Sequence, residues 1–358
     1  MIFLNKYTTK RRRRLTTFGK AFVLTVLVII LSIVLLLAKC AAGISNKNDF
    51  RPASTDTSTK TDISQKTPAS QEYKMKYAKR TNKTKKLKMD STNGILIDLK
   101  SNTIVAEKDS EEIIFPASLT KVMTLIVAVE NIKDLNDTFT FNLEILDPLF
   151  IEEASVAGFL NEETVPIIDL LYGAILPSGA DATTALALHI AGSEENFVKL
   201  MNEKAEEMGL KDTHFTNCSG LHDRNHYSTV HEIALIMKYA MENKTCRKIL
   251  STLEYTTTKT PQNPDGLHLY SNTFERMYGT EAVGVTIIAG KTGYTTESGN
   301  CLVSYAEDND GKSYILATTG ASGSYKPIYD AINIYAKYAG TGETDIRPDV
   351  PTAYNYGY

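Results

Sequence analysis

The sequence has few cysteines and histidines, and their positions argue against two common kinds of stabilising or functional site. Only four cysteines occur in 358 residues, too few and too widely separated for a disulfide framework. No group of cysteines and histidines has the close spacing of a zinc site, so we expect no metal. A Cys218–Cys246 disulfide is chemically possible, and the sequence alone does not decide whether it forms.

The chain also has little net charge, −3 in total, but this value hides a division. Residues 1–90 contain 20 lysines and arginines against 5 acidic residues, whereas residues 91–358 contain 19 against 37. A basic N-terminal part therefore precedes an acidic remainder. An acidic folded part repels phosphates, which argues against a protein that binds nucleic acid. No fixed repeat occurs, and the 42% hydrophobic content is typical of a globular protein.

An apolar run near the N-terminus predicts a membrane segment. Residues 21–38 carry no charge, and basic residues precede them at 10–14 and 20. Eighteen helical residues span about 27 Å, close to the hydrocarbon thickness of a bilayer. We expect a transmembrane anchor or signal sequence over 21–39, with the basic segment 1–20 in the cytoplasm and the rest outside. The length of the run favours an uncleaved anchor over a cleaved signal peptide.

Residues 40–90 are expected to be a polar, basic linker that is disordered. This stretch is rich in serine, threonine and lysine and shows no hydrophobic period of 2 or 3.6. Eight basic residues lie between Lys74 and Lys88. They are interpreted either as part of a solvated spacer or as a segment attracted to anionic lipid headgroups or an anionic wall polymer.

Residues 91–340 show an α+β pattern, and residues 341–358 are expected to be a C-terminal tail. Strands are predicted at 94–99, 104–107, 282–289, 301–307 and 313–318. Helices are predicted at 118–131, 165–176, 181–190, 193–208, 229–241 and 328–338, with Ser193 as an N-cap. Because strands at both ends of this region flank the helices, we expect one sheet with a helical subdomain inserted between its first and last strands.

A Ser-x-x-Lys motif, Ser118 to Lys121, begins the first of these helices. Residues three apart share a helix face, so the Lys121 amine can reach the Ser118 hydroxyl. A serine becomes a nucleophile when a base takes its proton, and burial lowers the pKa of a lysine enough for it to be that base. The alternative is a helix cap followed by a surface lysine. The apolar residues around Lys121 argue for a functional role.

Two further motifs are weaker when taken alone. Lys291-Thr292-Gly293 follows a β-rich run, where a glycine lets a substrate backbone lie along a strand edge. Lys291 offers a charge for a substrate carboxylate or for lowering the pKa of Lys121, although a lysine that merely ends a strand is the alternative. Ser178 lies in a turn between two predicted helices, where a serine relays a proton or only satisfies backbone groups.

Together and in this order, the three motifs resemble the signature of β-lactamases and penicillin-binding proteins. The surrounding segments are similar to one branch, the serine-type D-Ala-D-Ala carboxypeptidases of peptidase family S11, which are low-molecular-mass penicillin-binding proteins. The resemblance covers about residues 90–338. The segments that carry it are 115–124, 176–182, 209–217, 220–221, 226–229 and 290–295.

The resemblance implies a DD-peptidase fold, an antiparallel sheet flanked by helices, in a catalytic domain outside the membrane of a bacterial cell. It implies removal of the terminal D-Ala from peptidoglycan stem peptides through an acyl-enzyme, with β-lactams as acylating inhibitors and no cofactor. It further implies that Ser118 is the nucleophile, Lys121 the general base and Ser178 a proton relay. The implied substrate-binding residues are Lys291, Thr292, Gly293 and Tyr294, with the backbone N–H groups of Ser118 and Tyr294 as an oxyanion hole.

The sequence departs from the family pattern at Ala180, where the second motif usually ends in asparagine. The missing side-chain amide affects the expected rate and substrate preference more than acylation itself. One alternative function is a β-lactamase-like hydrolase, which needs a carboxylate to activate water. Another is a catalytically silent protein that binds the cell wall. Candidate carboxylates for the first alternative are Glu144, Glu152, Glu153, Glu162 and Glu163.

Overall fold

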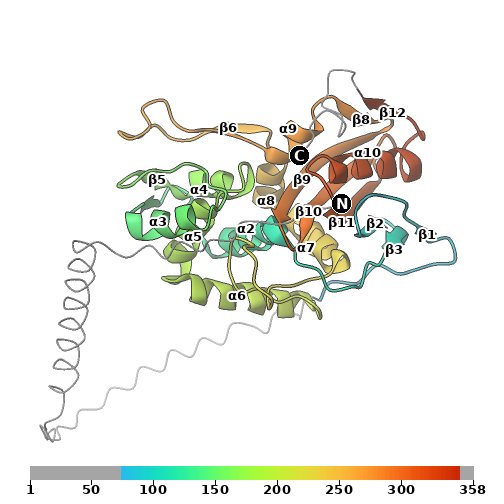
Figure 1. The fold of residues 1–358 in the computed structure, drawn as a ribbon, viewed down its shortest axis with the longest axis horizontal. Coiled ribbons are helices and arrows are strands. Elements are labelled where there is room, and N and C mark those ends of the chain that lie inside the picture. The colour runs from blue at the N-terminus through green and yellow to red at the C-terminus, as the bar shows by residue number, and fades with distance from the viewer. Residues whose placement is uncertain (1–73, 347–358) are drawn as a thin grey trace, which may run out of the picture. The chain divides into compact units, whose positions relative to one another are not determined.

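The structure is a computed structural model and describes residues 74–346. An eight-stranded sheet in the order β1-β3-β2-β11-β10-β9-β8-β12 forms its framework (Figure 1). All neighbouring strands are antiparallel except β1 and β3. The strands are β1 Lys85–Lys86, β2 Asn93–Asp98, β3 Thr103–Lys108, β8 Thr280–Ala282, β9 Val285–Thr295, β10 Gly299–Asp308, β11 Ser313–Ala321 and β12 Thr344–Ile346.

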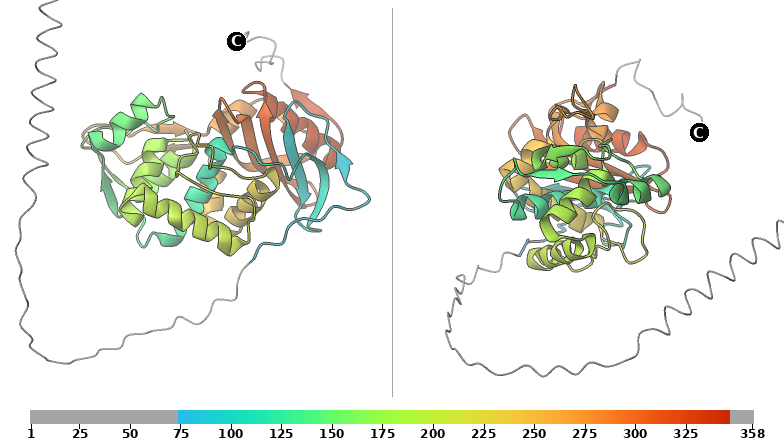
Figure 2. Two further views of the ribbon diagram at one scale, coloured as in Figure 1. Left: turned by 60° about the horizontal axis from the view of Figure 1, so that its bottom comes forward. Right: turned by 90° about the vertical axis from the view of Figure 1, so that its left-hand side faces the viewer.

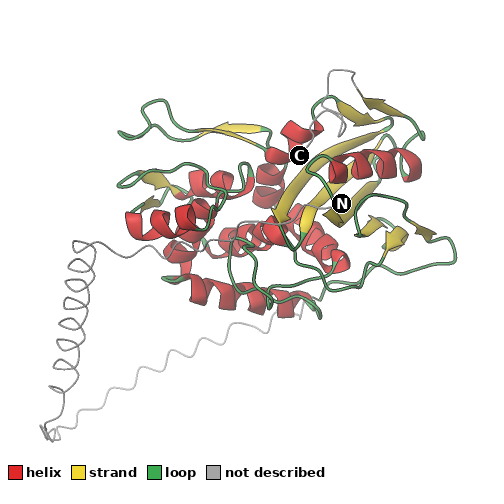
Figure 3. Ribbon diagram, in the orientation of Figure 1, coloured by secondary structure: helices red, strands yellow, loops and turns green. Residues whose placement is uncertain are grey.

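Helices cover both faces of this sheet because its strands are apolar on both faces. Helix α10 (Lys326–Tyr338) packs on one face, where Leu96 and Leu316 belong to its hydrophobic cluster. Helices α7 (Val230–Glu242) and α8 (Lys244–Leu250) pack with α2 on the other face, where Ile95 and Ile315 belong to a larger cluster (Figure 3). Adjacent residues of one strand therefore point to opposite faces of the sheet and belong to different hydrophobic clusters, as the alternation of side chains along a strand requires.

The helical subdomain lies beside the sheet and is built around α2 (Figure 2). Residues 120–128 of α2, within the helix predicted at 118–131, are all buried. The other elements are η1 Ala117–Leu119, α2 Thr120–Asn131, α3 Leu143–Ile151, α4 Ile167–Ile175, α5 Ala180–Ala191 and α6 Glu194–Met208, with α9 Asn272–Met277 near the sheet. Two small hairpins pair β4 Thr138–Thr140 with β5 Thr164–Pro166 and β6 Glu254–Thr256 with β7 His268–Tyr270. Ser193 caps α6 as predicted, accepting a hydrogen bond from the Asn196 N–H.

The strand predicted over 282–289 is wrong at both ends. A turn at Val283 and Gly284 separates β8 from β9, and Gly284 has a φ of +87°, which favours glycine. β9 then continues to Thr295, so Lys291-Thr292-Gly293 lies inside a strand and not after one. Residues 291–295 lack the apolar alternation that predicts a strand, and they are held in β9 by backbone pairing with β10.

The predicted linker boundary at residue 90 is too late, because residues 74–90 pack on the domain. Met75, Ala78 and Leu87 are buried. The Met75 N–H donates to the Met208 carbonyl at 2.9 Å, and the Leu87 N–H donates to the Glu107 carbonyl at 2.9 Å. These few apolar residues, scattered among basic ones, produce no hydrophobic period and were therefore missed.

The transmembrane segment predicted over 21–39 lies outside the described residues. Between residues 74 and 346, no helix has the length and apolar character needed to cross a membrane. Contacts divide the chain into units 1–67 and 68–358, and both hydrophobic clusters lie in the second unit. A fragment of residues 68–358 therefore contains its own core and can fold by itself.

The three cysteines of the described part, Cys218, Cys246 and Cys301, are buried free thiols. The Cys218–Cys246 disulfide that the sequence left open is therefore not formed. Burial raises the pKa of Cys246 to about 12 and that of Cys301 to about 11, which keeps both thiols protonated at neutral pH.

Replacing Asp330 with alanine should destabilise the domain by about 2–4 kcal/mol. The Asp330 carboxylate accepts hydrogen bonds from the Asp90 N–H at 2.9 Å and from the Ser91 N–H and hydroxyl at 2.8 and 2.7 Å. The substitution leaves these donors unpaired where residues 90 and 91 join α10. Chemical denaturation measures the change, with the exposed Asp265→Ala as a control. Equal stability of the two variants would contradict this role.

Candidate active site

The structure brings Ser118 and Lys121 together where η1 leads into α2. The Lys121 Nζ lies 3.2 Å from the Ser118 Oγ, and it donates to the Ser219 carbonyl at 2.5 Å. Lys121 is 2% exposed. Burial lowers its pKa to about 8, because a charged amine loses its hydration there. At pH 7 the neutral amine is therefore a minor but accessible form of Lys121, and this form can accept a proton from Ser118.

The backbone before Ser118 is held in an unusual conformation. Ala117 has a φ of +48°, in the left-handed region that non-glycine residues rarely occupy. Gly220 lies against it, and a Cβ at Gly220 would come within 2.0 Å of the Ala117 carbonyl oxygen. The loop that carries Ser219 therefore packs directly on the segment that carries Ser118. Such strain is common at functional sites, where surrounding contacts hold it.

Ser178 and Lys291, which are 113 residues apart, also meet. Lys291 is 1% exposed, and its Nζ donates to the Ser178 Oγ and to the Thr292 carbonyl, both at 2.8 Å. Burial lowers the pKa of Lys291 well below its ordinary value, and the nearby charge of Lys121 lowers it further. The three side chains predicted as catalytic and the predicted substrate-binding Lys291 thus form two hydrogen-bonded pairs, Ser118 with Lys121 and Ser178 with Lys291.

Strand β9 presents an edge to the site. On one side it pairs with β10, with Lys291 opposite Val303 and Gly293 opposite Cys301. Within the described residues, β8 is its neighbour on the other side and pairs only at Val285. The backbone of β9 near Gly293 is therefore available to a substrate chain. Thr292 is nearly buried, whereas the side chain of Tyr294 is 61% exposed.

At Gly293, strand β9 lies close to the backbone of Ser118. A Cβ at this position would lie 2.9 Å from the Ser118 nitrogen and 3.2 Å from the Ala117 Cβ. Any side chain would therefore push β9 away from Ser118. This contact explains why the third residue of the motif is glycine.

Gly293→Ala should reduce acylation of Ser118 by about 100-fold, because a displacement near 1 Å misaligns reacting groups. Gly323→Ala serves as a matched control, since its Cβ would meet only the Lys326 Cγ at 3.5 Å. Labelling rates with a fluorescent penicillin measure the effect, and thermal denaturation checks that both variants fold. Wild-type labelling by Gly293→Ala would refute the proposed close approach.

Asp181 holds residues 155–158 beside the turn that contains Ser178, a role that the sequence did not predict. Its buried carboxylate accepts the backbone N–H groups of Ala157 at 2.7 Å and Gly158 at 3.0 Å. Burial raises the pKa of Asp181, while these hydrogen bonds oppose the rise. The Ala180 N–H donates to the Ser155 carbonyl at 2.7 Å. Residues 155–158 are thereby held beside the Ser178 turn.

His214 and His226 lie in two of the segments that carry the family resemblance, and both make contacts typical of structural residues. The His226 Nε2 lies 2.7 Å from the Thr120 Oγ1, and burial lowers its pKa to about 4. The ring is therefore neutral at pH 7. The His214 Nδ1 lies 2.6 Å from the Asn225 carbonyl.

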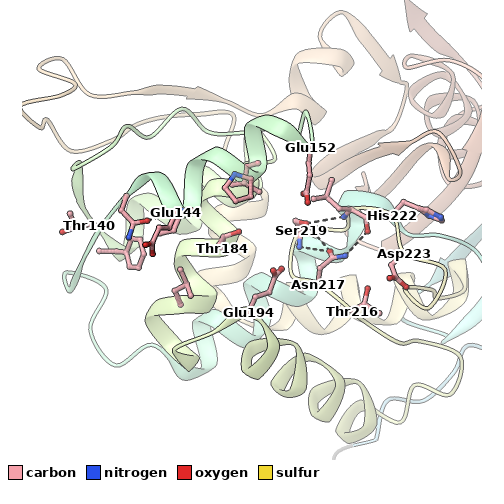
Figure 4. Close-up of a pocket in the computed structure, with 17 residues that line it drawn as sticks. Thr140, Glu144, Glu152, Thr184, Glu194, Thr216, Asn217, Ser219, His222 and Asp223 are labelled. Atoms are coloured by element: carbon pink, nitrogen blue, oxygen red, sulfur yellow. Dashed lines mark hydrogen bonds between the residues drawn. The ribbon is translucent and has the colours of Figure 1, made fainter. Parts of the chain in front are cut away.

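A cavity of about 1060 Å³ opens beside the loop that holds Ser219 (Figure 4). Helices α3 and α5 form one wall, and the loop from Thr216 to Asp223 forms the other. Its lining includes four carboxylate residues, Glu144, Glu152, Glu194 and Asp223. Because Ser219 contributes to this wall and its carbonyl also binds Lys121, the cavity adjoins the pair formed by Ser118 and Lys121.

Comparisons with known proteins agree on one family. The sequence profile described as D-alanyl-D-alanine carboxypeptidase, peptidase S11, matches residues 78–323. The D-alanyl-D-alanine carboxypeptidase DacF of Bacillus subtilis is 32% identical over 254 residues, which are 69% of this chain and 61% of the relative. DacA of Haemophilus influenzae is 32% identical over 249 residues, 68% of this chain and 59% of the relative. The chain thus spans about 60% of the length of these curated relatives.

Solved structures show the same relationship. The DD-transpeptidase of Streptomyces K15 superposes with a TM-score of 0.63 at 28% identity, over 70% of this chain and 98% of the other. Penicillin-binding protein 5 of Haemophilus influenzae gives a TM-score of 0.61 at 26% identity, over 70% and 72%. The predicted DD-peptidase fold is therefore confirmed. Because the family profile matches more than half of its length, the chain belongs to the peptidase S11 family of D-alanyl-D-alanine carboxypeptidases.

Proposed function

We propose that this protein is a serine-type D-Ala-D-Ala carboxypeptidase that removes the terminal D-Ala of peptidoglycan stem peptides and is acylated by β-lactams. The observation that carries the proposal is the contact of Ser118 with Lys121, a buried lysine whose pKa is lowered to about 8. Membership of the peptidase S11 family supports the same reaction.

In the acylation step, the neutral Lys121 amine takes the proton of the Ser118 hydroxyl as its oxygen attacks the carbonyl carbon of the D-Ala-D-Ala bond. The developing oxyanion is received by the backbone N–H groups of Ser118 and Tyr294. The proximity of Gly293 to the Ser118 nitrogen supports this arrangement, because it brings β9 beside the nucleophile.

Collapse of the tetrahedral intermediate then breaks the C–N bond and releases D-alanine. Ser178 relays to the leaving amine the proton that Lys121 took from Ser118, which makes Lys121 neutral again, and the hydrogen bond that holds Ser178 to Lys291 at 2.8 Å supports this role. Lys291 and Thr292 receive the terminal carboxylate of the substrate. Water finally attacks the ester of Ser118 and returns its proton to the serine, which regenerates the enzyme.

All of these groups are present even though position 180 is alanine and not the usual asparagine. The Lys121 Nζ donates to the Ser219 carbonyl. This hydrogen bond helps to orient the amine in the absence of the asparagine amide that the family usually has at position 180. Acylation is therefore retained, and the substitution alters how the substrate peptide is held.

No observation favours the two alternative functions. For a β-lactamase-like reaction, a carboxylate must activate water at the acyl-enzyme. In residues 74–346, none of the five candidate glutamates has a hydrogen bond with Ser118 or Lys121, and the buried Glu163 binds Asn263 and Thr260 instead. A catalytically silent role is not favoured, because both reactive pairs are intact.

The catalytic domain is held outside the bacterial cell membrane by residues 21–39. Support comes from the sequence, where an uncharged run of about membrane thickness follows a basic cluster. Extraction of membranes with alkaline carbonate tests this location, because an anchored chain stays in the pellet and a cleaved, released form does not.

The decisive experiment for the function supplies a stem pentapeptide ending in D-Ala-D-Ala to the 68–358 fragment and measures released D-alanine. Release by the wild type but not by Ser118→Ala is expected. Rapid turnover of penicillin without D-alanine release would instead favour a β-lactamase. Tight binding of muropeptides without either reaction would favour a silent wall-binding protein.

A further inference from the structure

Six exposed lysines lie on the N-terminal segment of the domain and form what is here named the basic strip. They are Lys76, Lys79, Lys83, Lys85, Lys86 and Lys88. We propose that the basic strip is a docking surface for anionic phospholipid headgroups, so that the catalytic domain lies against the membrane by a defined face.

The basic strip has a fixed position on the domain. Its segment follows the outer edge of β3, where the Lys79 N–H donates to the Asn102 carbonyl at 3.1 Å and Lys85 pairs with Ala106. Buried Met75 and Leu87 hold the segment at its two ends. The lysines are therefore presented by a folded surface, which the interpretation as a solvated spacer does not provide.

The charge of this segment contrasts with that of the remaining domain. Residues 74–90 contain eight basic residues and one acidic residue, a balance of +7, whereas residues 91–346 contain 18 basic and 36 acidic residues, a balance of −18. None of the six lysines forms an ion pair with a carboxylate of residues 74–346, whereas the neighbouring Arg80 pairs with Glu107. Their charges are thus not neutralised by ion pairs, although Lys85 and Lys86 line a surface pocket that also contains Glu107, Glu111 and Glu112.

Protection of the sheet edge explains only part of the basic strip. Edge strands often carry lysines that prevent pairing with other chains. However, only Lys85 and Lys86 belong to β1, and the other four lysines lie outside it. The concentration of these lysines in one segment of an otherwise acidic domain favours an anionic binding partner.

Phospholipid headgroups are the anionic partner that we favour, because the proposed anchor would hold the basic strip near a membrane. The proposed anchor ends 35 residues before the basic strip begins to fold onto the domain at residue 74, and 35 residues reach at most about 120 Å. The inference therefore rests in part on the anchor proposed above. A cluster of basic residues close to a membrane binds anionic lipid, with each lysine increasing the binding constant roughly fivefold.

Docking by the basic strip leaves the active site accessible. β1 is at one end of the sheet, and β9 is five positions away in the strand order. At the usual spacing of neighbouring strands, this separation is about 24 Å. The membrane would thus contact one edge of the domain while Ser118 and the edge of β9 stay open to the cell wall.

The test measures binding of the 68–358 fragment, which lacks the proposed anchor, to sedimenting vesicles of phosphatidylcholine with and without phosphatidylglycerol. We expect binding only to the anionic vesicles, decreasing as salt is added. A variant with serine at Lys83, Lys85, Lys86 and Lys88 should bind at least about tenfold more weakly. The matched control has serine at four exposed lysines elsewhere, Lys133, Lys248, Lys259 and Lys312, and should retain wild-type binding.

Three outcomes would overturn the proposal: equal binding to both kinds of vesicle, an equal loss in the control variant, or binding to soluble poly(glycerol phosphate) without binding to vesicles. The last would assign the basic strip to a phosphate polymer. Penicillin labelling of Ser118 in the same samples reports on the proposed function separately. Vesicle binding with no labelling would count against the carboxypeptidase assignment and leave the docking surface standing.

Discussion

Ser118→Ala is expected to abolish labelling by penicillin and to reduce D-alanine release by at least about 10⁴-fold. In the proposed reaction the Ser118 Oγ forms the acyl bond, and within residues 74–346 it is the hydroxyl that has a hydrogen bond with the Lys121 amine. Ser178 is held by Lys291 and lies on a different segment. Burst kinetics with a fluorescent penicillin and a D-alanine assay measure the two losses.

Ser101→Ala is the matched control for this experiment. Ser101 lies in the turn between β2 and β3, and its hydroxyl contacts only the nearby Thr103 at 2.7 Å among the described residues. It should be labelled at the wild-type rate. Covalent labelling that persists in Ser118→Ala would mean that another residue is the nucleophile, and the proposed reaction would have to be abandoned.

Lys121→Met should lower the acylation rate by about 10³-fold or more, because it removes the base but keeps an unbranched apolar stem. In the wild type, the neutral amine is the active form. The acylation rate should therefore rise with pH and level off above the lowered pKa of about 8. Below that value, each unit of pH should reduce the rate about tenfold, and Lys121→Met should lose this dependence.

The stability of Lys121→Met distinguishes a catalytic loss from misfolding. A lysine whose folded pKa lies below its unfolded value of 10.5 makes the folded state less stable at acidic and neutral pH, and this cost disappears as the pH rises above both values. Removing the buried amine should therefore leave the melting temperature at pH 7 unchanged or higher. A lower melting temperature together with a normal acylation rate would show that Lys121 is a structural residue.

The succession of motifs was the most informative part of the sequence. Ser118 and Lys121 were paired correctly because their contact is local, across one turn of helix. The buried environment of Lys121 was predicted for the same reason, since its apolar neighbours are adjacent in sequence. The meeting of Ser178 with Lys291 was expected only through resemblance to a family, because no local rule joins residues 113 positions apart.

Other features depended on contacts that sequence patterns do not report. The Ser219 carbonyl that binds Lys121 is a backbone group, so its residue type carries no signal. Asp181 acts through the backbone N–H groups of a distant loop. The segment 74–90 was interpreted as a linker, because its few buried residues fit a surface that β3, α6 and α7 provide only in the folded protein.

Local periodicity and short motifs were enough to predict the α+β class, the buried helix that follows Ser118, and, through the family resemblance, the residues proposed to react. Only the tertiary structure decided that Gly293 approaches the Ser118 nitrogen, that Cys218 and Cys246 remain thiols, and that the basic segment is part of the domain. These properties depend on distances between remote parts of the chain, and packing sets those distances.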